Sequence, residues 1–326
     1  MLQLSNLTRF GVRWDRLLPD AYWLRHGRIS DKRISAILNS GGFQFGDQWS
    51  SHYSPRKLSS LVAFCRRYHR QKTKLIYLPQ ACGPFENTLA RDIVKPAYEY
   101  CSLFCARDRI SLEHLTSAVG TDEKSALSPD FTNLLPPAST DAVANSPCGH
   151  VCIIPNTKML THSPPQVSSR YMAFLSALAG DVVQAGHAIV FVNHEGSNDE
   201  LIIGELMDAL HGHCTFNPDL TAREIKGVIK QSKMVVSSRF HGVASGLNQG
   251  VPTFCTSWSH KYPELMKDYG YGDHVLDVND YQGAWRRVKT ALAAVQTCAW
   301  APKRNEIDEQ RRRTAAMWSR VHRELF

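Results

Sequence analysis

The chain has 326 residues, of which 43% are hydrophobic and 21% charged, and its formal net charge is +8. This composition is ordinary for a globular protein and excludes a largely disordered chain, and the length suffices for two domains. No apolar run approaches the roughly 18 residues that span a bilayer, and the first residues lack a signal-peptide core. The positive charge favours anionic partners, while the missing zinc-finger spacing and RNP-type motif argue against nucleic acid.

The nine cysteines include no CxxC pair. Two CxxxC spacings, Cys101/Cys105 and Cys148/Cys152, lie in segments expected to be strands, where the sulfurs would be roughly 13 Å apart. We therefore expect reduced cysteines packed as small apolar groups, and a cytosolic location.

Short apolar runs alternate with amphipathic stretches along most of the chain. The runs predict parallel strands buried on both faces, at residues 34–41, 74–80, 100–107, 150–155, 187–194, 233–238 and 251–257. Helical patterns lie between them, at residues 54–71, 168–186, 198–212 and 220–232, and the first opens with Ser54 as N-cap and Pro55 in the first turn. This alternation predicts a doubly wound α/β fold.

A break rich in proline and serine at residues 134–149 predicts a linker. We expect two Rossmann-like lobes facing a central cleft, one over residues 1–147 and the other over residues 148–326. The tail at residues 303–326 reads as a basic helix, which either crosses back onto the first lobe or presents a solvated face.

Ligands of open α/β sheets bind beyond the carboxyl ends of the strands, so polar residues that follow apolar runs are site candidates. The strongest group follows the run that ends at Ser238, where Arg239, Phe240 and His241 come at once. Arg239 and His241 are two apart and share one side of an extended segment, next to a helix amino end that favours an anion. The alternative is that Arg239 pairs with a carboxylate of the core and His241 is merely hydrogen-bonded.

Other strand ends carry further candidates. Lys261, beside His260, follows the next run and either reaches the same crevice or is a surface lysine. Arg107 is a candidate for binding an anion, and Asp108 after it reads as a helix N-cap. The remaining candidates are Gln80 at a strand tip ended by Pro79, Asp130 on a short exposed stretch, and His194 between Asn193 and Glu195.

Several motifs, taken in chain order, resemble the polysaccharide pyruvyl transferase family over roughly residues 34–270. They are LPQACGPF, CARDRISLEHL, SPDFTN, IIPNTKM and SSRFHGVASGLNQGVPTF, followed by SWSHKYPELM. The resemblance implies a fold similar to the two-lobed, GT-B type glycosyltransferases, with the active site between the lobes. It implies transfer of the pyruvyl group of phosphoenolpyruvate to two hydroxyls of a sugar in a polysaccharide, glycan or lipid-linked precursor. The products would be a cyclic ketal and phosphate.

Carried onto this sequence, the resemblance makes His241 the catalytic acid/base, with Arg107, Arg239 and Lys261 holding the donor. Gln80 and His194 complete the expected substrate-binding set. Phosphoenolpyruvate is a co-substrate, and no metal or other cofactor is expected. Family members usually open with a strand and a Gly–Asn–Gly–Asp type turn, which residues 1–33 lack, so the first lobe is expected to be shortened.

Two other functions remain open. A nucleotide-sugar glycosyltransferase would need a carboxylate near the ribose, for which Glu264 comes closest. A non-catalytic phosphosugar-binding protein of polysaccharide assembly is the second. As a role compatible with any of these functions, the basic tail could rest on an anionic membrane surface, through Arg311, Arg312, Arg313, Arg320 and Arg323 with Trp318 and Phe326.

Overall fold

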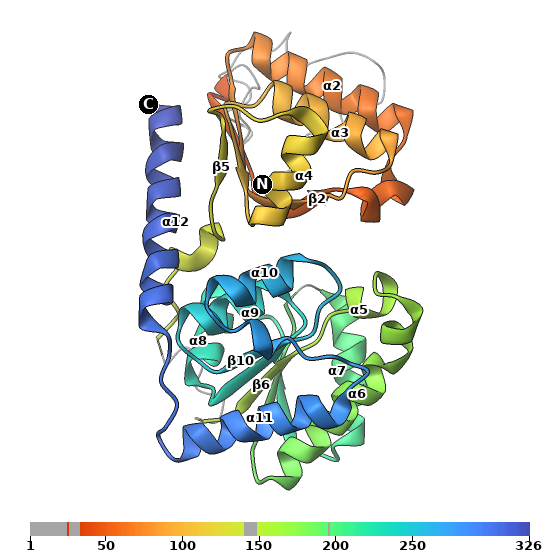
Figure 1. Cartoon of the computed structure of the whole chain (residues 1–326), viewed down its shortest axis with the longest axis vertical. Coiled ribbons are helices and arrows are strands. Elements are labelled where there is room, and N and C mark those ends of the chain that lie inside the picture. Colours follow the sequence, from red (N-terminus) through yellow and green to blue (C-terminus); the bar gives the residue numbers. More distant parts are fainter. Residues whose placement is uncertain (1–24, 26–32, 140–148, 195) are drawn as a thin grey trace. The chain divides into compact units, whose positions relative to one another are not determined.

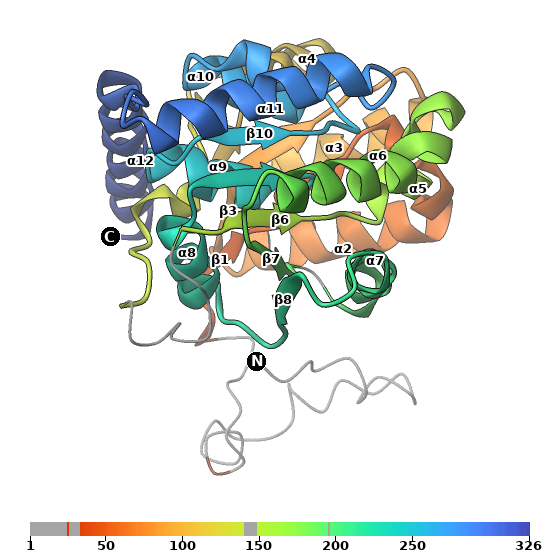
Figure 2. The same cartoon turned by 90° about the horizontal axis from the view of Figure 1, so that it is seen from below.

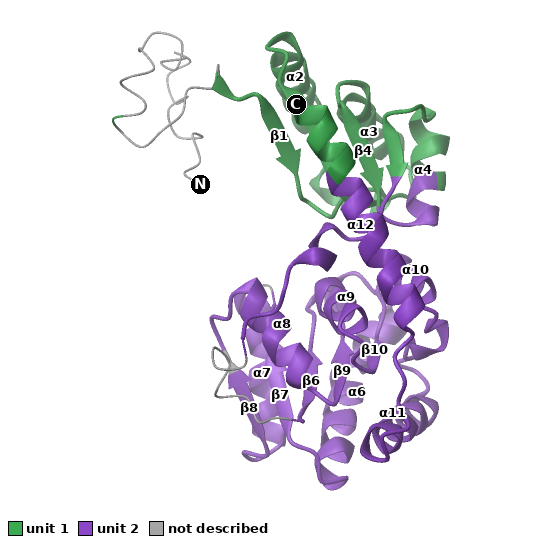
Figure 3. Cartoon of the chain, turned by 90° about the vertical axis from the view of Figure 1, so that its left-hand side faces the viewer, with its two compact units in different colours: residues 1–106, 113–126, 319–326 green, residues 107–112, 127–318 purple. Residues whose placement is uncertain are grey.

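The computed structural model of the chain describes residue 25 and residues 33–139, 149–194 and 196–326. The chain divides into two compact units (Figure 3). Unit 1 comprises the chain up to Ala106, Glu113–Ala126 and Ser319–Phe326, and unit 2 comprises Arg107–Leu112 and Leu127–Trp318. The predicted boundary at residues 147 and 148 lies outside the described residues, as does nearly all of the opening segment, and both predictions stand as made.

Unit 1 is built on a five-stranded sheet with the order β1-β3-β4-β5, in which β2 also pairs with β3. The strands are β1 (Ala36–Asn39), β2 (Phe43–Phe45), β3 (Lys74–Cys82), β4 (Leu103–Ala106) and β5 (Ser125–Leu127), and β1, β2 and β4 run parallel to β3. Helices α2 (Pro55–Arg70), α3 (Thr88–Glu99) and α4 (Arg109–Val119) connect them (Figure 1). As predicted, Ser54 caps α2 by accepting from the Lys57 N–H, with Pro55 in the first turn. The core of this unit is aromatic, and Tyr77 stacks on Phe104 at 5.0 Å.

Unit 2 is built on a sheet with the order β10-β9-β6-β7-β8, in which every neighbouring pair is parallel. Its strands are β6 (Val151–Ile154), β7 (Ile189–Val192), β8 (Cys214–Asn217), β9 (Met234–Ser237) and β10 (Thr253–Cys255). Its helices are α5 (Lys158–Thr161), α6 (Pro165–Gln184), α7 (Ser197–Ala209), α8 (Ala222–Gln231), α9 (Phe240–Asn248), α10 (Lys261–Asp268), α11 (Tyr281–Gln296) and most of α12 (Arg304–Leu325). The strand order reverses between β6 and β9, the switch point where ligands of doubly wound folds bind.

Both faces of the unit 2 sheet are covered by helices, and Figure 2 shows α6 and α11 lying across one of them. Val151 and Ile153 of β6 point to the face covered by α6, α7 and α11, and Cys152 and Ile154 point to the face covered by α8. Successive strand residues face opposite sides, so two covered faces require every residue to be apolar. This explains why the strand runs in the sequence show little polar alternation.

The α/β fold with parallel sheets is as predicted, and each of the predicted strands and helices is present, with bounds that are shorter, longer or shifted by a few residues. Three strands were not predicted: β2 (FQF), β5 (SAL) and β8 (CTFN). Each of the three contains polar residues and lies outside the longer apolar runs from which the other strands were predicted. The expectation that Cys101 lies in a strand is wrong, because β4 begins two residues later. Cys148 lies outside the described residues, and the cysteines within them are free thiols.

Helix α12 is anchored by side chains that the sequence suggested for membrane contact. Arg311 donates from Nη2 to the Asn248 carbonyl at 2.8 Å, and the Trp318 indole donates to the Phe131 carbonyl at 3.2 Å. Arg320 donates to the carbonyl oxygens of Glu123 and Ser125. Arg312, Arg323 and Phe326 remain exposed. None of the described helices combines the length and apolar surface that crossing a bilayer requires.

Candidate functional site

Polar residues gather beyond the carboxyl ends of β6, β7 and β9, at the switch point of the unit 2 sheet. These residues pack on a buried hydrogen-bond network that is centred on Ser238. The Ser238 carbonyl accepts from the Tyr262 hydroxyl at 2.7 Å and from Asn156 Nδ2 at 2.8 Å. The Ser238 hydroxyl oxygen accepts from the hydroxyls of Tyr171 and Thr256, both at 2.7 Å. Such a satisfied network fixes the start of the segment that follows β9.

We call the residues above this network the strand-end cluster: Arg107, Asp130, His194, Arg239, His241 and Lys261. All of them belong to unit 2. The structure therefore brings five of the six predicted site residues into one unit, joined by a carboxylate, Asp130, to which no role was assigned.

Arg239 pairs with a buried carboxylate, as the alternative interpretation of its sequence position supposed. Its Nε and Nη2 atoms lie 2.7 and 2.5 Å from Oδ2 of Asp199, whose side chain is fully buried. Oδ1 of Asp199 accepts from the Thr157 N–H at 3.0 Å and from the Thr157 hydroxyl at 2.7 Å. Burial lowers the pKa of Arg239 and raises that of Asp199, and the close contact of the two opposite charges offsets part of the cost of burying them.

Asp130 lies between two predicted site residues. Its Oδ2 is 3.4 Å from His241 Nε2 and 3.5 Å from Arg107 Nη1. The Arg107 guanidinium also rests on the Phe240 ring, 4.1 Å from its centroid. Burial by itself would raise the pKa of Asp130, but His241 and Arg107 outweigh it and hold that pKa below its usual range. Asp130 is only 2% exposed, so the expectation that it lies on an exposed stretch is wrong.

His194 follows β7 and stacks on His241, with ring centroids 5.7 Å apart and planes at 14°. Burial, reinforced by the charges of His241 and Arg239, lowers the pKa of His194 to about 3. His194 is therefore a neutral imidazole at neutral pH, able to donate from one nitrogen and accept at the other.

Lys261 is the first residue of α10 and is 8% exposed, so the alternative of a surface lysine is wrong. Its ammonium lies over the rings of Trp258 at 4.5 Å and Tyr262 at 5.4 Å. Burial and the charges of Arg107 and Arg239 lower its pKa well below the ordinary value. With Arg107 and Asp130 it lines a cavity of about 10 Å³, room for a single water molecule. A larger anion would have to displace side chains or approach along the exposed edge of His241.

Asp108 acts as predicted at the start of α4. Its Oδ1 accepts from the Ser111 N–H at 2.7 Å, which is the contact of an N-cap. His260 lies 3.2 Å from the Ser111 hydroxyl and 3.8 Å from the Asp108 carboxylate. His260 is thus part of the structure around the helix start.

Gln80 does not lie at a strand tip, and that expectation is wrong. Strand β3 continues through Pro79 to Cys82, because β2 pairs with its last residues. The Gln80 side chain is fully buried, donates to the Leu78 carbonyl at 3.1 Å and accepts from Gln44 at 3.1 Å. Gln80 belongs to unit 1, whereas the residues of the strand-end cluster belong to unit 2.

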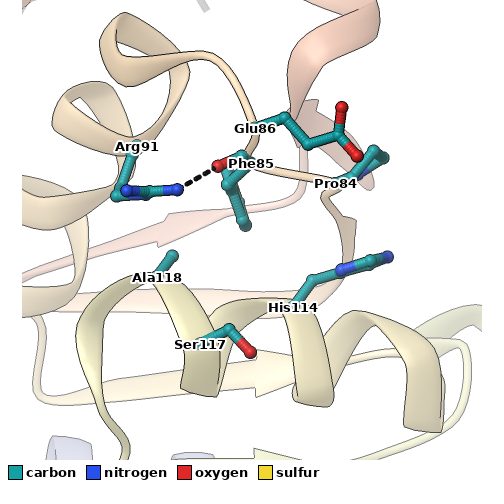
Figure 4. A pocket seen from close by; sticks show the side chains of 7 residues that line it. All are labelled: Pro84, Phe85, Glu86, Arg91, His114, Ser117 and Ala118. Carbon is teal, nitrogen blue, oxygen red and sulfur yellow. Dashed lines mark hydrogen bonds between the residues drawn. The ribbon is translucent and has the colours of Figure 1, made fainter.

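Unit 1 has a pocket of its own, shown in Figure 4, with a volume of about 210 Å³. We call it the unit 1 pocket. It is lined by Pro84, Phe85, Glu86, Arg91, His114, Ser117 and Ala118. Arg91 donates to the Phe85 carbonyl at 2.8 Å, and Asp47 accepts from the N–H groups of Glu86 and Asn87. The wall formed by the loop after β3 is therefore held in place by hydrogen bonds.

Asp199 was not predicted from the sequence. Asp130 and Lys158 stand in predicted motifs, but neither was assigned a role. Lys158 follows β6 at the switch point, and its pKa is lowered by burial and by Arg239. The signal for Lys158 was its place after an apolar run, in the motif IIPNTKM. Asp199 gave no such signal, since an acidic residue in the first turn of a helix is common.

No group of three or more His, Cys, Asp or Glu side chains within the described ranges is arranged to hold a metal ion.

Solved structures of the GT-B type share the α/β fold with parallel sheets. A HepE protein of Anabaena in complex with UDP and glucose has 12% identity and a TM-score of 0.59, covering 98% of this chain and 84% of its own. UDP-GlcNAc 2-epimerase of Methanocaldococcus jannaschii has 11% identity and a TM-score of 0.54, covering 84% and 71%. The corresponding epimerase of Neisseria meningitidis has 9% identity and a TM-score of 0.51, covering 86% and 76%.

The sequence itself identifies the family. The sequence profile of the polysaccharide pyruvyl transferases matches residues 8–260, and the chain belongs to that family of transferases of polysaccharide synthesis. No curated protein sequence matches the chain.

Proposed function

We propose that the chain transfers the pyruvyl group of phosphoenolpyruvate to two hydroxyls of one sugar residue. The acceptor is a polysaccharide, a glycan or a lipid-linked precursor, and the products are a cyclic pyruvate ketal and phosphate. The observation that carries the proposal is the family membership of a chain whose strand-end cluster concentrates cations around two histidines.

The cations of the cluster suit a small donor with two anionic groups. Phosphoenolpyruvate carries a phosphate and a carboxylate on three carbons, and Arg107, Arg239 and Lys261 supply three positive groups. Each charge-assisted hydrogen bond contributes about 1.5–3 kcal/mol net. Asp130 and Asp199 pair with the two arginines, and an incoming anion would oppose the lowering of the Lys261 pKa.

The reaction needs a proton acceptor for the hydroxyls and a proton donor for the enol carbon. The first sugar hydroxyl adds to C2 of the donor while C3 gains a proton and becomes a methyl group. Phosphate then leaves with its bridging oxygen, and the second hydroxyl adds to C2 and gives up its proton. His241 fits the acid/base role because an imidazole ring can both accept and donate a proton and its side chain is 39% exposed.

Substituting His241→Gln tests that role. We expect turnover to fall by at least about 100-fold, the usual worth of an acid/base group, while the affinity for phosphoenolpyruvate changes little. An equal loss of affinity and rate would assign His241 to donor binding.

A nucleotide-sugar glycosyltransferase is the second candidate, favoured by the HepE structure that holds UDP and glucose on the same fold. Glu264, the closest match to a ribose-binding carboxylate, instead pairs with Lys267 at 2.8 Å. A phosphosugar-binding protein without catalysis is the third candidate.

Thermal unfolding with added ligand separates these candidates. At about 100 times its dissociation constant a ligand stabilises by about 2.7 kcal/mol, or several degrees for domains of this size. A shift with phosphoenolpyruvate and none with UDP-sugars supports the proposal, and the reverse supports glycosyl transfer. The Arg312→Gln variant loses an exposed positive charge outside the strand-end cluster, so its unfolding temperature should shift with ligand as that of the wild type does. Donor binding without phosphate release from any of a panel of glycans would favour the non-catalytic protein.

A lipid-linked acceptor would bring the protein to an anionic membrane face, and peripheral contact through α12 belongs to the proposal. Arg312 and Arg323 are two exposed basic groups of α12 that suit this contact, each worth up to about 1 kcal/mol. The Arg312→Glu/Arg323→Glu double variant should lose sedimentation with vesicles containing phosphatidylserine. Unchanged sedimentation would remove α12 from any membrane contact.

A further inference from the structure

The two oxygens of Asp130 have different neighbours. Oδ1 accepts from the Thr132 N–H at 2.9 Å and from the Thr132 hydroxyl at 2.5 Å. Oδ2 lies 3.4 Å from His241 Nε2 and 3.5 Å from Arg107 Nη1, distances at which charge rather than a formed hydrogen bond is the main attraction. One oxygen thus fixes the carboxylate to its own loop, and the other is presented to two members of the cluster.

The loop that carries Asp130 is itself fixed. The Thr314 hydroxyl of α12 donates to the Asp130 carbonyl at 3.3 Å, and Asn133 donates to Thr314 at 3.2 Å. Asn248 of α9 donates to the Asn133 carbonyl at 2.6 Å. The position of the carboxylate is therefore set by α9 and α12 before any ligand arrives, as expected of a group that orients another.

The His241 ring is buried at one nitrogen and open elsewhere. Its side chain is 39% exposed, yet Nε2 is buried and faces the Asp130 carboxylate. His194 stacks on the ring and limits its rotation. The nitrogen that a ligand can reach is then Nδ1.

An ionised carboxylate accepts hydrogen bonds at both oxygens and donates none. Its proximity to Nε2 favours the tautomer that carries the ring proton there and leaves a lone pair on Nδ1.

We propose that Asp130 is a positioning residue that holds His241 in the Nε2–H tautomer and makes Nδ1 the nitrogen that exchanges protons with substrate. The tautomer of His241 follows from the structure alone. Proton exchange between Nδ1 and substrate rests on the proposed function, and separate measurements test the two.

The tautomer can be read directly from ¹⁵N-histidine-labelled protein by long-range ¹H–¹⁵N NMR. At a pH where the His241 ring is neutral, we expect the protonated nitrogen to be Nε2, with the His241→Gln variant identifying the signal. Asp130→Asn should abolish or reverse this preference, because an amide can donate as well as accept. Glu264→Gln, which removes another carboxylate of unit 2, should leave it unchanged. A wild-type His241 protonated at Nδ1 overturns the proposal, and this measurement does not require Asp130→Asn to fold.

Donor affinity provides the second test. Asp130→Asn removes a carboxylate that competes with an anion for Arg107, so the dissociation constant of phosphoenolpyruvate should stay the same or fall by up to about tenfold. A dissociation constant that rises more than tenfold would mean that Asp130 merely supports the site, which overturns the proposal. If phosphoenolpyruvate binds neither protein, the proposed function fails, and the NMR result still decides the role of Asp130.

Discussion

The strand-end cluster of unit 2 and the unit 1 pocket both lie beside a parallel sheet, yet they place their polar groups in opposite ways. In the cluster Arg107, Arg239 and Lys261 are at most 8% exposed, and the two arginines pair with buried carboxylates. In the unit 1 pocket Glu86, Arg91 and Ser117 are exposed, and the volume is about 210 Å³. Buried charge is costly unless it is paired, so a cluster of this kind must be stabilised by its own architecture. The polar groups of the unit 1 pocket are exposed, so they carry no comparable free-energy cost of burying charge.

The largest effect that this comparison predicts is on the buried pair of unit 2. Arg239→Ala leaves Asp199 buried without its partner and should destabilise unit 2 by about 3–5 kcal/mol. Arg312→Ala breaks the exposed pair with Glu309 and should cost about 0.5 kcal/mol or less. Denaturant unfolding, followed with a probe in unit 2, measures both. The Arg239→Ala/Asp199→Ala double variant should recover part of the loss, and a single-variant cost below about 1 kcal/mol would contradict the buried-pair argument.

An intermediate effect is expected at the wall of the unit 1 pocket. Gly83 has φ +82°, and a Cβ there would lie 2.4 Å from the His114 side chain. Gly83→Ala should therefore destabilise unit 1 by about 2–3 kcal/mol, since it adds backbone strain to a clash. Gly120→Ala is the matched control, because its φ is +67° and a Cβ would meet nothing within 4 Å. Equal losses of stability in the two variants would show that the clash with His114 contributes nothing. Both variants should still bind phosphoenolpyruvate.

The smallest effect concerns Lys261 and the pH. Its pKa is depressed in the free protein by burial and by Arg107 and Arg239, while Asp108 and Asp130 oppose the shift. An anionic donor raises that pKa again, so binding should take up protons and tighten as the pH falls through the pKa of free Lys261. Calorimetry in buffers of different ionisation enthalpy measures this uptake. Lys261→Met should abolish it and weaken binding about tenfold, whereas Lys267→Met, on the exposed side of α10, should do neither. Proton release by the wild type would contradict the assignment.

Sequence reasoning predicted the sheets of this protein well because their cause is local. A strand buried on both faces must be apolar throughout, and a helix start such as Ser54-Pro55 is set by adjacent residues. The strand-end rule likewise found Arg239, His241, His194 and Lys261. It failed at Gln80, because the pairing of β2 extends β3 past the proline that looked like its end.

The partners of these residues were beyond the reach of local patterns. Asp130 reads as exposed in the polar stretch SPDFTN, and only contacts from α9 and α12 enclose its loop. Asp199 is forty positions away from the arginine that it neutralises. Charge pairing across such separations depends on the folded chain, so the sequence predicted the cations of the site but not the carboxylates that hold them.

The anchoring of α12 bears on the order in which the protein can be made. A ribosome produces unit 2 strands β6 to β10 long before it produces Thr314 and Trp318, which fix the loop around Asp130. Arg320, which contacts Glu123 and Ser125 of unit 1, comes later still. A nascent chain can therefore form its sheets early, but the site and the edge of unit 1 are completed only when this helix has left the exit tunnel. Protein synthesis that stalls shortly before α12 would yield a chain in which both sheets are formed. The loop around Asp130 and the edge of unit 1 at Glu123 and Ser125 would lack their contacts with this helix.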